Sequence, residues 1–97
     1  MENILEVIDK TKRRIRLTEK QWRHIMKKHP SLTGYLKEIE ETLKYPDKIT
    51  SYSNDVNVRY YYKHFKNVKL NKYLLTIVKY LNGDGFVISV YFINKIK

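Results

Sequence analysis

The strongest constraint on the fold is a hairpin signal near the end of the chain. The turn sequence Asn82-Gly83-Asp84-Gly85 separates two segments rich in Val, Ile, Leu and Tyr, over residues 73–81 and 85–93. Asn-Gly tolerates the positive backbone angles that tight hairpin turns require, so we expect these segments to pair as antiparallel strands. Further strands are expected over residues 48–53 and 57–65, which would complete a four-stranded antiparallel sheet.

Two helices are expected ahead of this sheet. Thr18 followed by Gln21 is a capping-box pattern that begins a helix over about residues 19–29, and Pro30 favours an end at that point. Apolar residues that recur at helical spacing predict a second helix over residues 33–44. The fold class is therefore expected to be α+β, with two N-terminal helices packed on one face of a roughly four-stranded antiparallel sheet.

Size and charge limit the classes of partner. The 97 residues suffice for a single domain over residues 1–97, and 20 Lys and Arg against 10 Asp and Glu leave a net charge of +10. A surplus of this size favours polyanions as partners, that is RNA, DNA or an acidic membrane or protein surface. Part of the charge lies in the turn of residues 10–14, between apolar residues that suggest one or two short N-terminal strands.

The chain contains no cysteine, which excludes disulfides, thiolate metal sites and cysteine nucleophiles. A small domain without disulfides fits a reducing cytoplasm. No apolar run is long enough to cross a membrane, and the opening residues Met1-Glu2-Asn3 do not start a signal peptide. We therefore expect a cytoplasmic protein without a membrane partner.

The first expected helix carries two histidines, His24 and His29. Histidine titrates near neutral pH and can exchange a proton with a ribose hydroxyl, so both are candidates for acid–base catalysis. Their spacing of five residues puts them about 140° apart around a helix, so they cannot chelate one metal ion as an i, i+4 pair would. The alternatives are a surface histidine for His24, which lies among cations that include Lys28, and a packed or dipole-stabilised residue for His29 beside Pro30.

The strand expected over residues 57–65 carries a second candidate group. Alternation divides its polar side chains between two faces, with Arg59, Tyr61 and Lys63 on one and Tyr60, Tyr62 and His64 on the other. The Arg59 face suits a phosphodiester, because Arg can hold two phosphate oxygens, Lys adds a point charge, and Tyr donates a hydrogen bond or stacks. The alternative is an exposed strand face whose charges protect a sheet edge.

The last expected strand carries hydroxyl groups at Ser89 and Tyr91, with Lys79 on its hairpin partner. A two-residue turn would place Ser89 and Tyr91 on the face opposite Lys79, and a three-residue loop would reverse that relation, so both arrangements stay open. A lysine inside an apolar strand is a candidate for phosphate binding. The alternative is an edge position from which its charge reaches water.

The sequence lacks the patterns typical of nucleotide-binding loops and two-metal catalysis. It contains no Gly-rich phosphate loop and no carboxylate pair suitably placed. Cleavage of a phosphodiester is therefore expected to need neither a metal nor a cofactor. RNA permits this because its own 2′-hydroxyl can attack the adjacent phosphate, which leaves the protein to supply a base, an acid and positive charge.

Several short motifs follow one another in a particular order. They are Leu17-Thr18, Trp22, His24-Ile25, His29-Pro30, Pro46-Asp47 with Ile49, Arg59-Tyr60-Tyr61-Tyr62, Tyr73-Leu74 to Lys79, and Val87-Ile88-Ser89-Val90-Tyr91. Over roughly residues 14–93 this order resembles the phage-associated branch of the barnase, EndoU, colicin and RelE-like ribonuclease superfamily. Two positions depart from the pattern: Ser31 stands where members often have an acidic residue, and Ser89 where they often have Thr.

The resemblance implies two N-terminal helices on a four-stranded antiparallel sheet. It also implies metal-independent cleavage of RNA, often by a toxin, at a site formed by helix histidines and polar strand residues. We therefore expect an endoribonuclease that acts through the 2′-hydroxyl. The expected catalytic residues are His24, His29, Arg59, Tyr61, Ser89 and Tyr91, and the expected substrate-binding residues are Lys28, Lys63 and Lys79.

The expected partners are RNA and, for a toxin, an acidic inhibitor such as an antitoxin or immunity protein. Two other functions stay open. A non-catalytic RNA- or DNA-binding module would use the same Arg, Lys and Tyr side chains without cutting, and a protein-interaction domain would dock an acidic partner.

Overall fold

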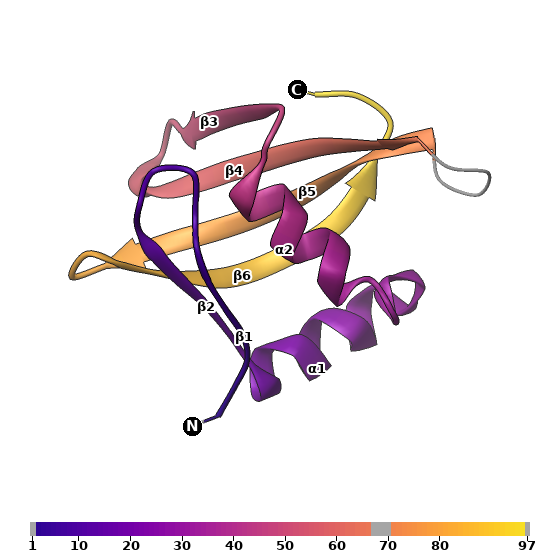
Figure 1. The fold of residues 1–97 in the computed structure, drawn as a ribbon, viewed down its shortest axis with the longest axis horizontal. Helices are drawn as coiled ribbons and strands as arrows, with labels where there is room; N and C mark the ends of the chain where they lie inside the picture. Colours follow the sequence, from indigo (N-terminus) through magenta and orange to yellow (C-terminus); the bar gives the residue numbers. More distant parts are fainter. Residues whose placement is uncertain (1, 67–70, 97) are drawn as a thin grey trace.

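The computed structural model describes residues 2–66 and 71–96 of the chain. Its elements are, in order, β1 (Asn3–Ile8), β2 (Arg14–Thr18), α1 (Glu19–Lys28), the 3-10 turn η1 (Pro30–Leu32), α2 (Leu36–Lys44), β3 (Lys48–Tyr52), β4 (Asp55–Lys66), β5 (Asn71–Leu81) and β6 (Asp84–Ile93). Figure 1 shows both helices against a single sheet, with β1 and β2 crossing the direction of the long strands. The α+β class predicted from the sequence is confirmed.

The sheet has six strands in the order β1-β2-β6-β5-β4-β3 and is mixed. The prediction of a four-stranded antiparallel sheet that follows two N-terminal helices is therefore wrong in strand number and in order. β1 and β2 form a hairpin that precedes both helices, and β2 joins β6 in parallel. Strands of six and five residues carry too little pattern to show which sheet edge they join, so their place depends on tertiary packing.

Gly85 allows β2 and β6 to come together. It pairs with Ile15 of β2. A Cβ atom at this position would lie 2.9 Å from Tyr80 Cε1, 2.9 Å from Val78 Cγ1 and 3.0 Å from Ile15 Cγ1. Packed interiors do not tolerate such short contacts, so the junction requires a residue without a side chain.

α1 begins and ends where the sequence predicts. The Thr18 side-chain oxygen accepts a hydrogen bond from the Gln21 N–H at 3.1 Å, which caps the first turn. At the other end the His29 N–H donates to the Ile25 carbonyl at 2.8 Å. Pro30 then continues the chain as η1, because its ring cannot extend the α-helix.

α2 begins at Leu36, later than the residue 33 that helical spacing predicts. η1 occupies residues 30–32, and Gly34 has a φ of +89°. A residue in this left-handed region interrupts a right-handed helix, so the second helix starts only after it.

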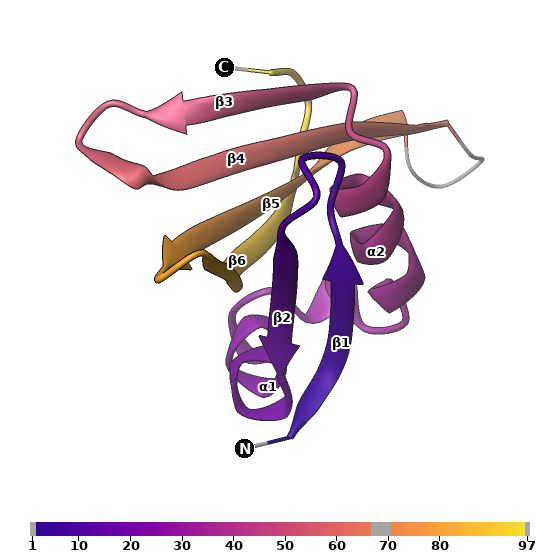
Figure 2. The ribbon, with the colours of Figure 1, turned by 60° about the vertical axis from the view of Figure 1, so that its left-hand side comes forward.

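Both helices pack on one side of the strands (Figure 2), α2 against β1, β4 and β5, and α1 against β1, β2 and β6. The main core lies between these layers and joins helix residues such as Trp22, Ile25, Ile39 and Leu43 to strand residues such as Ile15, Leu17, Leu74, Val78 and Val90. The opposite face of the sheet carries a smaller cluster of Val58, Tyr62, Leu75 and Ile77, to which no described helix residue belongs. We call this second face of β3 to β6 the open face.

The hairpin of β5 and β6 is confirmed. Its turn contains two residues, Asn82 and Gly83, with φ angles of +55° and +87°. These are the angles that make Asn-Gly a favourable hairpin turn. The connection between the strands predicted over residues 57–65 and 73–81 lies mostly outside the described residues.

Candidate functional site

The open face is lined with aromatic side chains. Around its buried centre lie the partly buried residues Tyr60, Tyr73, Tyr91, Ile93 and Ile96. Neighbouring rings contact one another, with centroids 5.9 Å apart for Tyr52 and Tyr60 and 6.4 Å apart for Tyr60 and Tyr62. A sheet face that presents aromatic rings and hydroxyls can hold nucleotides by stacking and hydrogen bonding.

His29 reaches this face from the C-terminal end of α1. Its ring stacks on Tyr91, with centroids 5.5 Å apart and an angle of 27° between the planes. Tyr91 lies on β6 directly opposite Leu75 of β5, which places it on the open face. A helix imidazole and a strand hydroxyl that are far apart in the sequence thus meet.

The contact is possible because α1 lies along the edge of β6. β2 pairs with β6 at Gly85 and Phe86. Beyond these pairs, Gln21 Nε2 of α1 donates a hydrogen bond to the Ile88 carbonyl at 2.7 Å. This bond holds the first turn of α1 beside β6, and the stack of His29 on Tyr91 places the C-terminal end of the helix beside the same strand.

The two other predicted residues of α1 differ in their relation to this edge. Viewed down the helix axis, the Lys28 side chain leaves α1 within about 20° of the direction of Gln21, on the flank that meets β6. His24 is exposed and lies about 60° from Gln21 on the side away from Ile25 and the core. The structure therefore brings Lys28 close to the site of His29 and leaves His24 on the outer surface of the helix.

A bulge in β6 determines the face that Ser89 occupies. Ile77 pairs with Ser89, whereas the next residue of β5, Val78, pairs with Val87, so that β6 contains one extra residue. The two-residue turn alone would put Lys79 on the face opposite Ser89. The extra residue reverses this relation, and Lys79 lies on the open face with Ser89, its Nζ 3.1 Å from Asp55 Oδ2.

Tyr60 is a further member of the open face that the sequence interpretation left out of the site. It lies opposite Ile77, which lies opposite Ser89, so Tyr60 and Ser89 share one row across the sheet. Burial raises the pKa of the Tyr60 phenol, and the neighbouring hydroxyls of Tyr91, Tyr52 and Tyr62 raise it further. The phenol therefore stays protonated and can donate a hydrogen bond at neutral pH.

Arg59, Tyr61 and Lys63 share one face, as strand alternation predicts, but it is the face that the helices cover. Ser89 and Tyr91 lie on the opposite face of the sheet, so the structure does not bring these three residues together with them. Alternation shows which side chains lie together, whereas the packing of the helices decides which face is free. The other half of the same strand places Tyr60 and Tyr62 on the open face.

The side chains of this covered face have other contacts. Lys63 Nζ donates to the Tyr45 carbonyl at 2.9 Å. The Arg59 guanidinium lies over the Tyr80 ring, 5.5 Å from its centroid, and Arg13 lies over the same ring at 4.8 Å. These contacts are cation–π interactions that hold the β1–β2 turn against β5.

Tyr61 belongs to a buried polar network. It is 0 % exposed, and its hydroxyl contacts the Asp9 carboxylate and the Tyr80 hydroxyl. The carboxylate also accepts the N–H groups of Arg13 at 2.8 Å and Thr11 at 3.0 Å. Burial alone would raise the pKa of Asp9, but these hydrogen bonds offset it and hold the pKa below its ordinary value. Burial and the contact with Asp9 raise the pKa of Tyr61, so its phenol stays neutral. The network links the β1–β2 turn to β4 and β5.

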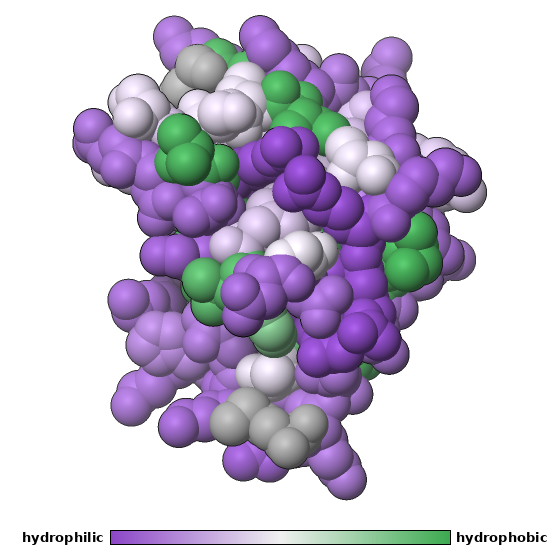
Figure 3. Space-filling model, turned by 90° about the vertical axis from the view of Figure 1, so that its left-hand side faces the viewer, coloured by the Kyte–Doolittle hydropathy of each residue, from purple (hydrophilic) through white to green (hydrophobic). Residues whose placement is uncertain are grey.

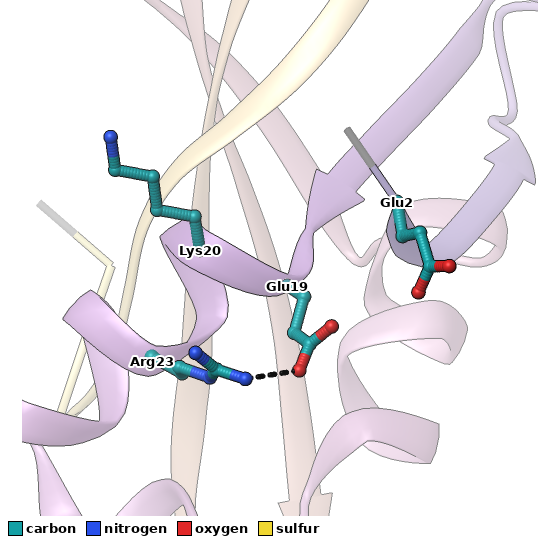
Figure 4. Close-up of a pocket in the computed structure, with 4 residues that line it drawn as sticks. All are labelled: Glu2, Glu19, Lys20 and Arg23. Carbon is teal, nitrogen blue, oxygen red and sulfur yellow. Dashed lines mark hydrogen bonds and ion pairs between the residues drawn. The ribbon is translucent and has the colours of Figure 1, made fainter.

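A shallow hollow of about 410 Å³ opens at the N-terminal end of α1, the end away from His29. It is lined by Glu2, Glu19, Lys20 and Arg23. Figure 4 shows Arg23 turned toward Glu19, with which it forms an ion pair, and Lys20 pointing away. These charges are paired or solvated, so the hollow offers no chemistry comparable to that of the open face.

The end of the molecule at which the β1–β2, β3–β4 and β5–β6 turns gather is shown in Figure 3. Hydrophilic side chains cover most of this end, and apolar side chains form small separate patches. Val56, Ile8 and Leu81 are exposed apolar residues near these turns, at 82 %, 53 % and 51 %. The charged surface is thus interrupted near the tip of the β3–β4 hairpin.

Among residues 2–66 and 71–96, no group of three or more His, Asp or Glu side chains is arranged to hold a metal ion. Within the same ranges, neither helix has the length and apolar character needed to span a bilayer.

Comparison with curated proteins and with solved structures found no significant match. The family model described as phage-Barnase-EndoU-ColicinE5/D-RelE like nuclease 2 matches residues 4–96. The match covers both helices, all of the open face and every residue of the site described above. The chain therefore belongs to this family of phage-associated nucleases.

Proposed function

We propose that the protein is a metal-independent endoribonuclease that cleaves RNA through attack of the 2′-hydroxyl on the adjacent phosphate. The observation that carries the proposal is the stack of His29 on Tyr91 at 5.5 Å, on a face that also holds Ser89 and Tyr60. Imidazole can exchange a proton with a ribose hydroxyl near neutral pH. Hydroxyl donors can stabilise the phosphate oxygens as they gain charge.

In the proposed reaction His29 takes the proton of the 2′-hydroxyl. The 2′-oxygen forms a bond to phosphorus, and the bond from phosphorus to the 5′-oxygen of the next nucleotide breaks. That oxygen takes up a proton from water, and His29 releases its proton to water afterwards, so the products are a 2′,3′-cyclic phosphate and a 5′-hydroxyl. Tyr91, Ser89 and Tyr60 donate hydrogen bonds to the phosphate, while Lys28 and Lys79 supply positive charge near it.

The test is incubation of the protein with RNA in excess chelator, followed by analysis of the end groups. We expect 2′,3′-cyclic phosphate and 5′-hydroxyl ends, and no cleavage of DNA or of RNA with methylated 2′-hydroxyls. His29→Ala is expected to lower turnover by about 10²- to 10⁴-fold with little change in RNA affinity. His24→Ala is expected to change turnover only slightly, because His24 is exposed and, unlike His29, stacks on no aromatic ring among the described residues.

His29→Phe is the matched control, since it keeps a flat ring against Tyr91 but cannot exchange a proton. Its melting midpoint should stay near that of the wild type while its turnover falls as in His29→Ala. A His29→Phe variant with full activity would limit His29 to a structural role. Products with 5′-phosphate ends, or cleavage of methylated RNA, would exclude attack by the 2′-hydroxyl.

A further inference from the structure

The β3–β4 hairpin carries a pair of stacked aromatic rings, of which the proposed chemistry uses only the hydroxyl group of Tyr60. The rings of Tyr52 and Tyr60 are nearly parallel, at an angle of 9°, with centroids 5.9 Å apart. Tyr52 is 39 % exposed, so part of its ring is available to a ligand. Figure 2 shows that this hairpin extends past the neighbouring strand β5, so its tip is accessible.

The exposed ring is held in place. Asn54 Nδ2 donates a hydrogen bond to the Tyr52 hydroxyl at 3.0 Å, and Tyr60 supports the ring by stacking. An aromatic side chain fixed in this way offers a flat surface without a large loss of side-chain entropy on binding. Isolated exposed tyrosines, such as Tyr45 at 66 %, lack a stacked neighbour among the described residues.

The pair lies in line with the proposed reaction centre. Tyr60 and Ser89 are members of one row, with Ile77 between them. They are two strand spacings apart, or about 10 Å. A nucleotide next to the cleaved phosphodiester can span this distance.

The charge of the surroundings selects the kind of ligand. Lys48 is exposed and lies on the open face opposite Tyr62, and Lys79 lies on the same face beside Asp55. The whole chain has a net charge of +10. Aromatic surfaces flanked by cations bind single-stranded nucleic acid, with bases on the rings and phosphates at the cations.

We propose that Tyr52 and Tyr60 form a stacking subsite for an unpaired nucleobase of RNA. This subsite rests on the proposed function, and it adds that the substrate is single-stranded. A base in a duplex is already stacked on both sides and cannot reach the Tyr52 ring. The subsite therefore distinguishes unpaired RNA from paired RNA by access to the base. It acts through stacking, so it tolerates different bases.

The test measures affinity for an RNA oligonucleotide with methylated 2′-hydroxyls, which the proposed reaction cannot cleave, as a single strand and as a duplex. Tyr52→Ala is expected to weaken binding of the single strand by about 5- to 150-fold, the effect of losing one base–aromatic stack. It should leave the affinity for the duplex unchanged. Tyr52→Trp should keep the affinity, whereas Tyr52→Leu, which keeps apolar area without a π-face, should lose it.

Tyr45→Ala is the matched control, because Tyr45 is an exposed tyrosine outside the open face, and it should bind as the wild type does. A series of oligonucleotides with one base removed at a time gives a second readout. The base removal that weakens wild-type binding most should have no further effect on binding by Tyr52→Ala, because the base removal and the substitution eliminate the same contact. The same melting midpoint in all variants shows that the comparison is made between folded proteins.

Equal effects of Tyr52→Ala on the single strand and on the duplex, or equal effects of Tyr52→Ala and Tyr45→Ala, would overturn the subsite. These outcomes are independent of cleavage. If the wild type cuts RNA and Tyr52→Ala binds normally, the subsite fails and the nuclease stands. If the wild type cuts no RNA but Tyr52→Ala loses affinity for the single strand, the nuclease fails and the subsite belongs to an RNA-binding module.

Discussion

Asp9 shows how a single charged residue holds this fold together. Its side chain is 4 % exposed and accepts hydrogen bonds from four residues: Thr11, Arg13, Tyr61 and Tyr80. We expect Asp9→Asn to lower the free energy of unfolding by about 1–3 kcal/mol, because the amide places a donor where other donors converge. Denaturant unfolding at neutral pH measures this loss. The exposed Asp47, which accepts the His64 N–H at 2.7 Å, is the control, and an equal loss in Asp47→Asn would contradict the role of the network.

The same residue predicts a dependence of stability on pH. The pKa of Asp9 is lower in the folded protein than its ordinary value of 3.8. Its carboxylate therefore contributes stability above that value, and the contribution is lost as the pH falls through the lower folded-state pKa. Below about pH 4, the wild type should lose stability more steeply than Asp9→Asn. Parallel stability curves for the two proteins would assign the acid sensitivity to another group.

At the scale of elements, the junction of β2 and β6 decides how the N-terminal hairpin joins the sheet. Gly85→Ala would place a Cβ atom 2.9 Å from Val78 Cγ1, and we expect it to lower the free energy of unfolding by about 1–3 kcal/mol. Amide hydrogen exchange should show faster exchange in β1 and β2 than elsewhere. Gly83→Ala is the control, because its φ is +87° and nothing lies within 4 Å. Gly83→Ala should lower the free energy of unfolding by about 1 kcal/mol through backbone strain, without faster hydrogen exchange confined to β1 and β2. A similar exchange pattern in both variants would contradict the role of Gly85.

At the scale of the whole molecule, the net charge of +10 should dominate binding to RNA. Affinity for the uncleavable single strand is expected to fall linearly on a log–log plot against salt, with each neutralised phosphate contributing about −0.7 to the slope. Lys28→Ala should reduce the slope by about that amount, because Lys28 lies on the flank of α1 beside β6. Lys37 is exposed on α2, which packs on the covered face, and Lys37→Ala should leave the slope unchanged. An affinity independent of salt would argue against RNA binding of any kind.

Local signals in the sequence predicted the elements that depend on local chemistry. The Thr18 cap and Pro30 bound α1, and the Asn82-Gly83 turn joins β5 and β6. The family resemblance was likewise available from the order of short motifs, and the family match over residues 4–96 agrees with it. The candidate residues His29, Ser89 and Tyr91 were named from the sequence as parts of one site, whereas the stacking of His29 on Tyr91 is seen only in the structure.

The sequence by itself thus determined the helix caps, the hairpin turn, the alternation of side chains and the positive charge, because each depends on neighbouring residues or on composition. Only the tertiary structure decided that β1 and β2 join β6, that Tyr61 is buried and Tyr60 lies on the open face, and that His29 meets Tyr91. Alternation sorts the side chains of a strand onto two faces, but it does not show which of the two faces is buried. Which face receives the helices, and which one is left for a ligand, follows from contacts between residues far apart in the chain.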